Sequence, residues 1–324
     1  MQMQDVFRYY EEDLKHVEWC MNQNLTSEVD LIPEIILHLL GSGGKRFRPL
    51  LLLATSDLCG YRGERRYPMS AMIEFIHTAT LLHDDVVDSA ETRRGKVSAN
   101  NIWGNAASIL VGDFLVSRSF RLVTEDGDLA IMRLLSTTTS TMAEGELFQM
   151  ARSGDVALTE GEYLSIIERK TATLIAAACA VGAMLANVPS RRIEALSRFG
   201  MSIGSAFQIT DDTLDYVAQV NEFGKAVGKD LEEGKLTLPL IHALNLSSAA
   251  ERKRIEEAVL ARGRKEKALE DVMAVIHSHG GIGYALDRAR MYVEEGKIIL
   301  DDFDESDAKA ALLAISDYVL ERRT

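Results

Sequence analysis

Apolar side chains recur along almost the whole chain at the spacing of three and four residues that one face of an α-helix presents. Ile35, Ile36 and Leu39 follow this spacing in one segment, and Leu196 and Phe199 follow it in another. Alternating apolar and polar positions between tight turns, the pattern of β-strands, are nearly missing from the sequence. The pattern therefore predicts an all-α protein.

Turn-forming residues divide this helical pattern into about ten or more helices. They lie at 41–44, Asp126-Gly127, 187–189, 224–234 and Gly280-Gly281. We find no low-complexity tract, no repeat with a solenoid period and no linker between them. The segments are therefore expected to pack as one helical bundle.

The composition of the 324-residue chain narrows the class of protein. Hydrophobic residues make up 47% and charged residues 26%, with only 5 prolines, which is typical of a globular protein with long helices. A net charge of −13 argues against a nucleic-acid-binding protein, so an anionic substrate would need local basic clusters. Cys20, Cys59 and Cys179 show no CxxC or disulfide-framework spacing, which favours a reducing cytoplasm.

Targeting and membrane signals are weak in this sequence. The N-terminus has no apolar stretch after a basic start, so we predict no signal peptide. The most membrane-like stretch, residues 171–186, is Ala-rich and shorter than the roughly 20 residues that a spanning helix needs. We interpret it as a buried core helix and predict no membrane span.

Two segments each carry two adjacent aspartates with a third aspartate three residues further on. The first is LLHDDVVD, which ends at Asp88, and the second is QITDDTLD, which ends at Asp215. On a helix, Asp84 and Asp88 are i and i+4 and project from one face, and Asp211 and Asp215 repeat that spacing. Each triad follows an apolar run, so we expect the carboxylates near the inner ends of core helices.

Such clustered carboxylates need cations, because two charges about 4 Å apart repel by about 4 kcal/mol at an effective dielectric constant of 20. Oxygen ligands suit Mg²⁺, which shares its coordination shell between carboxylates and substrate phosphates. Helix N-caps or solvated surface groups are the alternative, which the repetition of the triad disfavours. A third acidic group lacks the i,i+4 pair and is predicted to be a linker or helix cap: Asp301, Asp302 and Asp304.

Basic residues lie close to the acidic segments in the sequence. Arginine forks and lysine point charges bind diphosphate, although each of these side chains alone is typical of a solvated surface. His77 lies two turns before Asp84, where a core position and a diphosphate ligand are equally consistent, and His83 is interpreted as structural. The basic residues are Lys45, Arg46, Arg48, Arg93, Arg94, Lys170, Lys225, Lys229 and Lys235.

Taken together, these motifs resemble those of the all-trans polyprenyl diphosphate synthases, especially the octaprenyl-type bacterial enzymes. The resemblance runs from about Leu31 to the C-terminal helices. It rests, in the family's order, on GGKRFRP, EFIHTATLLHDDVVD, RRG, GDFL, GELFQ, KTATL, FQITDDTLD and GKDLEEGKLTLPL. It implies a single-domain bundle over residues 1–324, mostly antiparallel around a central cavity, that forms a homodimer and contacts membranes only peripherally for product release.

The resemblance also implies the residues of the site. It implies about three Mg²⁺ ions per active site, with Asp84, Asp88 and Asp211 as ligands and with Asp85, Asp212 and Asp215 helping directly or through water. It assigns isopentenyl diphosphate to Lys45, Arg48, His77 and Arg94, and the allylic diphosphate to Arg93, Lys170, Lys225 and Lys235. It places Thr171 and Gln208 at the reacting centre. Residues 224–234 are expected to form a lid.

The implied activity is repeated condensation of isopentenyl diphosphate with an allylic diphosphate, such as farnesyl diphosphate, to a long-chain polyprenyl diphosphate for quinone side chains. The small residues Ala79 and Thr80, about one turn before Asp84, favour a long-chain product, although helix packing explains small residues equally well. The resemblance implies that this product is octaprenyl diphosphate. Leu122, Val123 and Leu135 are candidates for the tunnel floor. A class I terpene cyclase, a geranylgeranyl or farnesyl synthase and a non-catalytic helical protein are the alternatives. The second aspartate triad and the basic residues around the first favour the elongating enzyme.

Overall fold

The computed structural model describes residues 1–40, 46–93, 95–221, 229–260 and 266–321, which form two compact units. Unit 1 comprises Met1–Thr139, Ala177–Ser197 and Phe303–Leu312, and unit 2 comprises Ser140–Ala176, Arg198–Asp302 and Leu313–Thr324. The expectation of a single domain around a central cavity stays a prediction.

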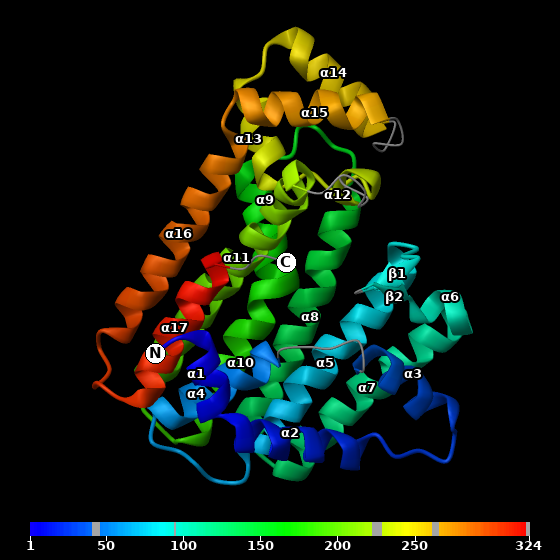
Figure 1. Ribbon diagram of the computed structural model, residues 1–324. Coiled ribbons are helices and arrows are strands. Elements are labelled where there is room, and N and C mark those ends of the chain that lie inside the picture. The colour runs from blue at the N-terminus through cyan, green and yellow to red at the C-terminus, as the bar shows by residue number, and fades with distance from the viewer. Residues whose placement is uncertain (41–45, 94, 222–228, 261–265, 322–324) are drawn as a thin grey trace. The chain divides into compact units, whose positions relative to one another are not determined.

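Helices account for nearly all of the secondary structure in these ranges, and the prediction of an all-α protein is confirmed (Figure 1). In chain order the elements are α1 (Met3–Tyr9), α2 (Glu11–Asn24), α3 (Leu31–Leu40), α4 (Phe47–Leu58), α5 (Arg66–Val87), β1 (Thr92–Arg93), β2 (Lys96–Val97), α6 (Ala99–Trp103), α7 (Asn105–Asp126), α8 (Leu129–Ala151), α9 (Glu160–Ile167), the π-helical turn η1 (Glu168–Ala172), α10 (Thr173–Leu185), α11 (Ser190–Asn221), α12 (Lys229–Glu232), α13 (Leu238–Leu246), α14 (Ala249–Leu260), α15 (Glu266–Ser278), α16 (Gly281–Leu300) and α17 (Asp307–Glu321).

Helix α5 is the central helix of unit 1 and packs against α2, α4, α6 and α7. Its residues from Met69 to Ile76 are all buried, as expected for a helix surrounded by other helices. The first aspartate triad ends this helix. The packing of α5 therefore fixes the position of the triad within unit 1.

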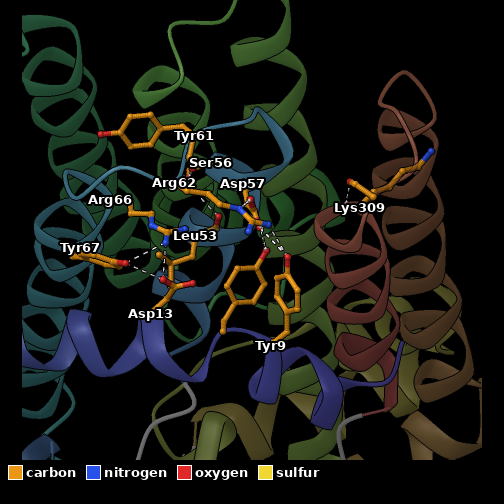
Figure 2. A network of polar contacts seen from close by, with 12 residues as sticks. Tyr9, Asp13, Leu53, Ser56, Asp57, Tyr61, Arg62, Arg66, Tyr67 and Lys309 are labelled. Carbon is orange, nitrogen blue, oxygen red and sulfur yellow. Dashed lines mark hydrogen bonds and ion pairs between the residues drawn. The ribbon is translucent and has the colours of Figure 1, made fainter.

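The N-terminal helices are attached to α4 and α5 by polar contacts, which are exposed at Arg62 and half-buried at Arg66 (Figure 2). Arg62, in the loop between α4 and α5, donates through Nη2 to Asp57 Oδ2 at 2.9 Å and to the Tyr9 hydroxyl at 2.7 Å. Arg66, at the start of α5, donates to Asp13 Oδ1 at 2.6 Å. These contacts fix α1 and α2 against the two helices that carry predicted site residues.

In unit 2, α16 packs along α13, and α14 and α15 lie side by side at one end of α16 (Figure 1). The π-helical turn η1 is approached closely by α8 and α11 at two glycines. A Cβ atom built at Gly145 would lie 2.8 Å from the backbone nitrogen of Lys170, and one built at Gly204 would lie 2.6 Å from Cα of Ala172. A larger side chain at either position would clash with η1. The two glycines therefore allow α8 and α11 to pack closely against this turn.

The Ala-rich segment forms the buried helix α10, so the prediction of a core helix is confirmed for Thr173–Leu185. Thr171, at the start of the predicted helix, belongs instead to η1. No helix in the part of the chain described is long and apolar enough to span a bilayer.

Several predicted turns also lie where the sequence placed them. Gly127 ends α7 with a left-handed backbone at φ +81°, and Gly280 precedes α16 at φ +68°. Asp301 is the C-cap of α16, so the third acidic group is a connection between helices as predicted. The short β1–β2 hairpin was not predicted, because strands of two residues are too short to show alternation.

Candidate active site

The first aspartate triad lies at the C-terminal end of α5 in unit 1. Asp84 and Asp88 are partly exposed, and Asp88 is the C-cap of the helix, with its backbone nitrogen donating to the Asp84 carbonyl at 2.8 Å. Asp85 is only 1% exposed, and its Oδ1 accepts a hydrogen bond from Arg93 Nε at 2.6 Å. The outer and middle aspartates therefore occupy different environments.

Arg93 belongs to the β1–β2 hairpin, which follows α5 after a short turn. The hairpin pairs Thr92 with Val97, and the Val97 carbonyl accepts from His38 Nε2 at 2.8 Å. Just before the hairpin, next to the same open end, Asn101 Nδ2 donates to the Ala90 carbonyl at 3.0 Å. The hairpin that carries Arg93 is thus held from α3 and from α6.

The predicted sites for isopentenyl diphosphate are described only in part. Arg48, in the first turn of α4, and His77, on α5, are partly exposed. Arg46 begins α4 with a left-handed backbone at φ 45°, and its Nη1 lies 3.1 Å from Oε1 of the buried Glu74. Lys45 and Arg94 lie outside the described residues.

The second triad lies within α11 in unit 2. Asp211 is exposed and Asp215 is half-buried, whereas Asp212 is 9% exposed. Both carboxylate oxygens of Asp212 accept hydrogen bonds at 2.6 Å, Oδ2 from the Tyr163 hydroxyl and Oδ1 from Gln208 Nε2. Burial raises the pKa of Asp212 to about 7, against the opposing effect of these two donors.

Lys170 and Thr171 lie on the π-helical turn η1, a rare geometry that is frequent at functional sites. Lys170 Nζ lies 2.5 Å from Glu146 Oε2 and donates to Gln149 Oε1 at 2.9 Å, both on α8. The Thr171 hydroxyl donates to Gln208 Oε1 at 2.9 Å. Hydrogen bonds therefore join Thr171 through Gln208 to the second triad.

The segment after α11 adds another acidic residue to unit 2. The backbone nitrogen of Asp230, on α12, donates to Asp215 Oδ2 at 3.4 Å. Burial, followed by the charge of Asp212, raises the pKa of Asp230 well above its usual range. Lys235 Nζ lies 2.6 Å from Glu233 Oε2, while Lys225 and residues 224–228 of the expected lid lie outside the described residues.

Sequence reasoning did not identify Tyr163, Glu146, Gln149 or Asp230 as site residues. Glu146 and Gln149 are i and i+3 in the GELFQ segment, so helical spacing places them on one face and could have indicated a shared contact. Asp230 lies in the GKDLEEGK segment beside the predicted lysines. Tyr163 has no local signal, because its contact with Asp212 joins residues far apart in the sequence.

Both triads have the donor chemistry that Mg²⁺ prefers, since every member is a carboxylate. Within the described ranges, no group of three or more His, Cys, Asp or Glu side chains is arranged to enclose a metal ion. The middle aspartates are directed toward Arg93 in unit 1 and toward Tyr163 and Gln208 in unit 2. The outer aspartates are therefore the better candidates for metal ligands.

The residues predicted to control product length all belong to unit 1. Thr80 is partly exposed, and its hydroxyl donates to the His77 carbonyl at 2.8 Å. The other four are buried: Ala79, Leu122, Val123 and Leu135. Thr80 is therefore the only one of these five residues that is more than slightly exposed.

The polyprenyl synthetase family model matches residues 29–276. An octaprenyl diphosphate synthase of Haemophilus influenzae is 36% identical, covering 99% of this chain and 98% of that protein. A short chain isoprenyl diphosphate synthase of Methanothermobacter thermautotrophicus is also 36% identical, covering 99% of each. The crystal structure of a polyprenyl synthase from Caulobacter crescentus, complexed with calcium and isoprenyl diphosphate, aligns with a TM-score of 0.94 at 40% identity, covering 100% of this chain and 98% of that one. The chain therefore belongs to the polyprenyl synthetase family.

Proposed function

We propose that this protein is a magnesium-dependent trans-prenyltransferase that extends an allylic diphosphate with isopentenyl diphosphate to a long-chain polyprenyl diphosphate. One observation carries the proposal: each of the two units contains both an aspartate triad and a cationic side chain suited to binding a diphosphate. In unit 1 that side chain is Arg93 against Asp85, and in unit 2 it is Lys170 on the turn whose Thr171 is linked to Asp212 through Gln208. Family membership supports the same reaction class.

Asp84, Asp88 and Asp211 would hold the Mg²⁺ ions, with Asp215 beside them. When bound, Mg²⁺ acts as a Lewis acid that stabilises negative charge on the departing diphosphate. Arg48 and His77, with Lys45 and Arg94, would hold isopentenyl diphosphate. Arg93, Lys170, Lys225 and Lys235 would hold the allylic diphosphate.

The residues of the chain stabilise charge that develops during the reaction. The allylic C–O bond breaks and its electron pair leaves with the diphosphate, toward which the Lys170 ammonium directs a fixed positive charge. Glu146 and Gln149 hold that ammonium, so little reorganisation is needed as the bond breaks. The double bond of isopentenyl diphosphate then attacks the allylic carbon, and the proton that is lost is taken by the released diphosphate.

We assign the product to the octaprenyl class, for quinone side chains, with farnesyl diphosphate as the primer. The octaprenyl relative supports this assignment, and the small residues before Asp84 favour a long-chain product. A shorter-chain synthase is the second candidate, since a short-chain relative is equally identical. We also infer a homodimer in a cytoplasmic, reducing environment, from the resemblance to the family and the cysteine pattern.

Product analysis tests the reaction and the length together. Purified protein with Mg²⁺, farnesyl diphosphate and labelled isopentenyl diphosphate should yield octaprenyl diphosphate by chromatography and mass spectrometry, and excess EDTA should abolish it. Thr80→Tyr should shorten the product and spare the first condensation, because Thr80 is partly exposed one turn before Asp84, while Thr80→Ser serves as the control. A cyclised hydrocarbon, or no elongation by the unmodified protein, would refute the proposal.

A further inference from the structure

We propose that Asp85 is a positioning residue that orients Arg93 toward the diphosphate, and that it is not a metal ligand. The proposal rests on the proposed function, because it assigns a separate role to one member of the first triad. It replaces the expectation, based on the family resemblance, that Asp85 assists the metal ions.

Burial separates Asp85 from its two neighbours in the triad. On α5, Asp85 is rotated by about 100° from Asp84 and is i,i+3 to Asp88, so the three carboxylates occupy adjacent parts of the helix surface. Asp85 is 1% exposed, whereas Asp84 and Asp88 are partly exposed. A group that binds a solvated metal and a substrate must be accessible, and in this triad only the outer pair meets that requirement.

Asp85 holds the segment that follows α5 at two points. Its Oδ1 accepts a short, charge-assisted hydrogen bond from Arg93 Nε at 2.6 Å. Its backbone carbonyl accepts from the Ala90 nitrogen at 2.9 Å. The side chain therefore orients Arg93, while the main chain fixes the turn from which the hairpin begins.

The rest of the hairpin is also held within unit 1. The backbone nitrogen of Ser98 donates to the Glu91 carbonyl at 3.0 Å, which closes the loop on itself. Asn101 bonds Ala90, just before the hairpin, and His38 bonds Val97, so both hold its open end. With the backbone held at these points, the Asp85 contact selects the orientation of the Arg93 side chain.

The geometry of this contact suits a positioning role. A guanidinium carries five N–H donors, and the contact with Asp85 uses the one on Nε. The Nη donors are not used by this contact, and their fork matches the oxygens of a diphosphate. The buried Asp85 carboxylate thus holds the Nε side of the Arg93 guanidinium, so that its Nη side can be directed toward an anion.

Metal binding and diphosphate binding can be measured separately to test this role. We would prepare Asp85→Asn, Arg93→Gln, the double variant and Asp84→Asn, and would titrate each by calorimetry with Mn²⁺ alone and with inorganic pyrophosphate in the presence of Mn²⁺. Hydrogen exchange of residues 89–98 would report on the hairpin. Glu125→Gln is the matched control, because Glu125 accepts from Arg121 Nε at 2.7 Å in an exposed pair on α7.

Asp85→Asn and Arg93→Gln should each weaken pyrophosphate affinity by about tenfold, and the double variant should lose little more, because both changes break one contact. Mn²⁺ affinity should fall for Asp84→Asn but not for Asp85→Asn, whose hairpin should exchange faster. Glu125→Gln should match the unmodified protein in every measurement. If Asp85→Asn is poorly folded by circular dichroism, Arg93→Lys replaces it and should also weaken pyrophosphate binding and speed hairpin exchange.

The proposal is overturned if Asp85→Asn weakens Mn²⁺ binding as much as Asp84→Asn does, or if its effect and that of Arg93→Gln multiply in the double variant. Unchanged pyrophosphate binding and hairpin exchange in Arg93→Lys would also overturn it. These results are distinguishable from failure of the proposed function, which is judged only by whether the unmodified protein elongates farnesyl diphosphate.

Discussion

The two aspartate triads have the same spacing in the sequence, yet the structure surrounds them differently. The first ends a helix, and its buried middle member, Asp85, faces the charged Arg93. The second lies inside α11, and its buried middle member, Asp212, accepts from the neutral groups of Tyr163 and Gln208. Burial raises the pKa of Asp212 to about 7, although the hydrogen bonds from Tyr163 and Gln208 act in the opposite direction. The two motifs thus have the same spacing of their outer aspartates, but different side chains bond the middle aspartate in each.

The largest expected effect tests whether the outer aspartates of the two triads are equivalent. Asp84→Ala and Asp211→Ala should each lower kcat by about 10³-fold, because each removes a carboxylate that would hold a metal against the departing diphosphate. Steady-state kinetics at saturating Mg²⁺ would measure the loss, and circular dichroism should show an unchanged helical content. Near-normal turnover in one variant alone would break the equivalence of the triads.

The next effect separates the cations of the two units. Arg48→Gln should raise KM for isopentenyl diphosphate by about tenfold, whereas Lys170→Gln should do so for the allylic diphosphate, because each cation is assigned to one anion. Initial rates with each substrate varied in turn would measure the split. Lys15→Gln, an exposed lysine on α2, serves as the control. Equal changes in both Michaelis constants for either variant would contradict the assignment.

A smaller effect is expected on stability when the neutral hydrogen-bond donor of Asp212 in the second triad is removed. Tyr163→Phe removes the hydroxyl that donates to Asp212 at 2.6 Å in a buried site, and should lower the free energy of unfolding by about 1–3 kcal/mol. Urea denaturation would measure it. Tyr284→Phe is the matched control, since its hydroxyl donates to Glu160 at 2.7 Å in a half-buried position, and its effect should be smaller. Equal losses would show that Asp212 is not specially dependent on its donor.

The smallest expected effect is a pH dependence of the stability that Glu162 contributes in unit 2. Glu162 closes the N-terminal cap of α9, and Arg152, followed by Thr159, lowers its pKa from 4.5 to about 2. A carboxylate with a depressed pKa stabilises the folded state above pH 4.5, and this contribution is lost as the pH falls toward 2.

Glu162→Gln should therefore lower Tm slightly at pH 7, and the difference from the unmodified protein should shrink below pH 4.5. Thermal denaturation at pH 7 and pH 3 would measure it. Glu257→Gln, an exposed site on α14, provides the control. A difference that is constant with pH would show that the contact does not depend on the charge of Glu162.

Local spacing was enough to predict the helices that carry the two triads, because helical periodicity depends only on neighbouring residues. The role of the outer aspartates as metal ligands stays a prediction. Local spacing also located the turns at Gly127 and Gly280, where the backbone is left-handed. The partners of Asp85 and Asp212 were beyond this reasoning. The contact of Tyr163 with Asp212 joins two separate helices, and its existence depends on how the chain packs.

The π-helical turn η1 has a consequence for comparing this chain with its relatives. A π turn holds one residue more than an α-helical turn, so it amounts to a single-residue insertion absorbed within a continuous helical run. A helical-wheel projection that counts 100° per residue through this insertion, as if the helix were regular, would rotate α9 relative to α10 by about 100°. Lys170 would then be placed on the wrong side of the helix. Homologous positions around Lys170 are therefore better matched by structural superposition than by heptad counting.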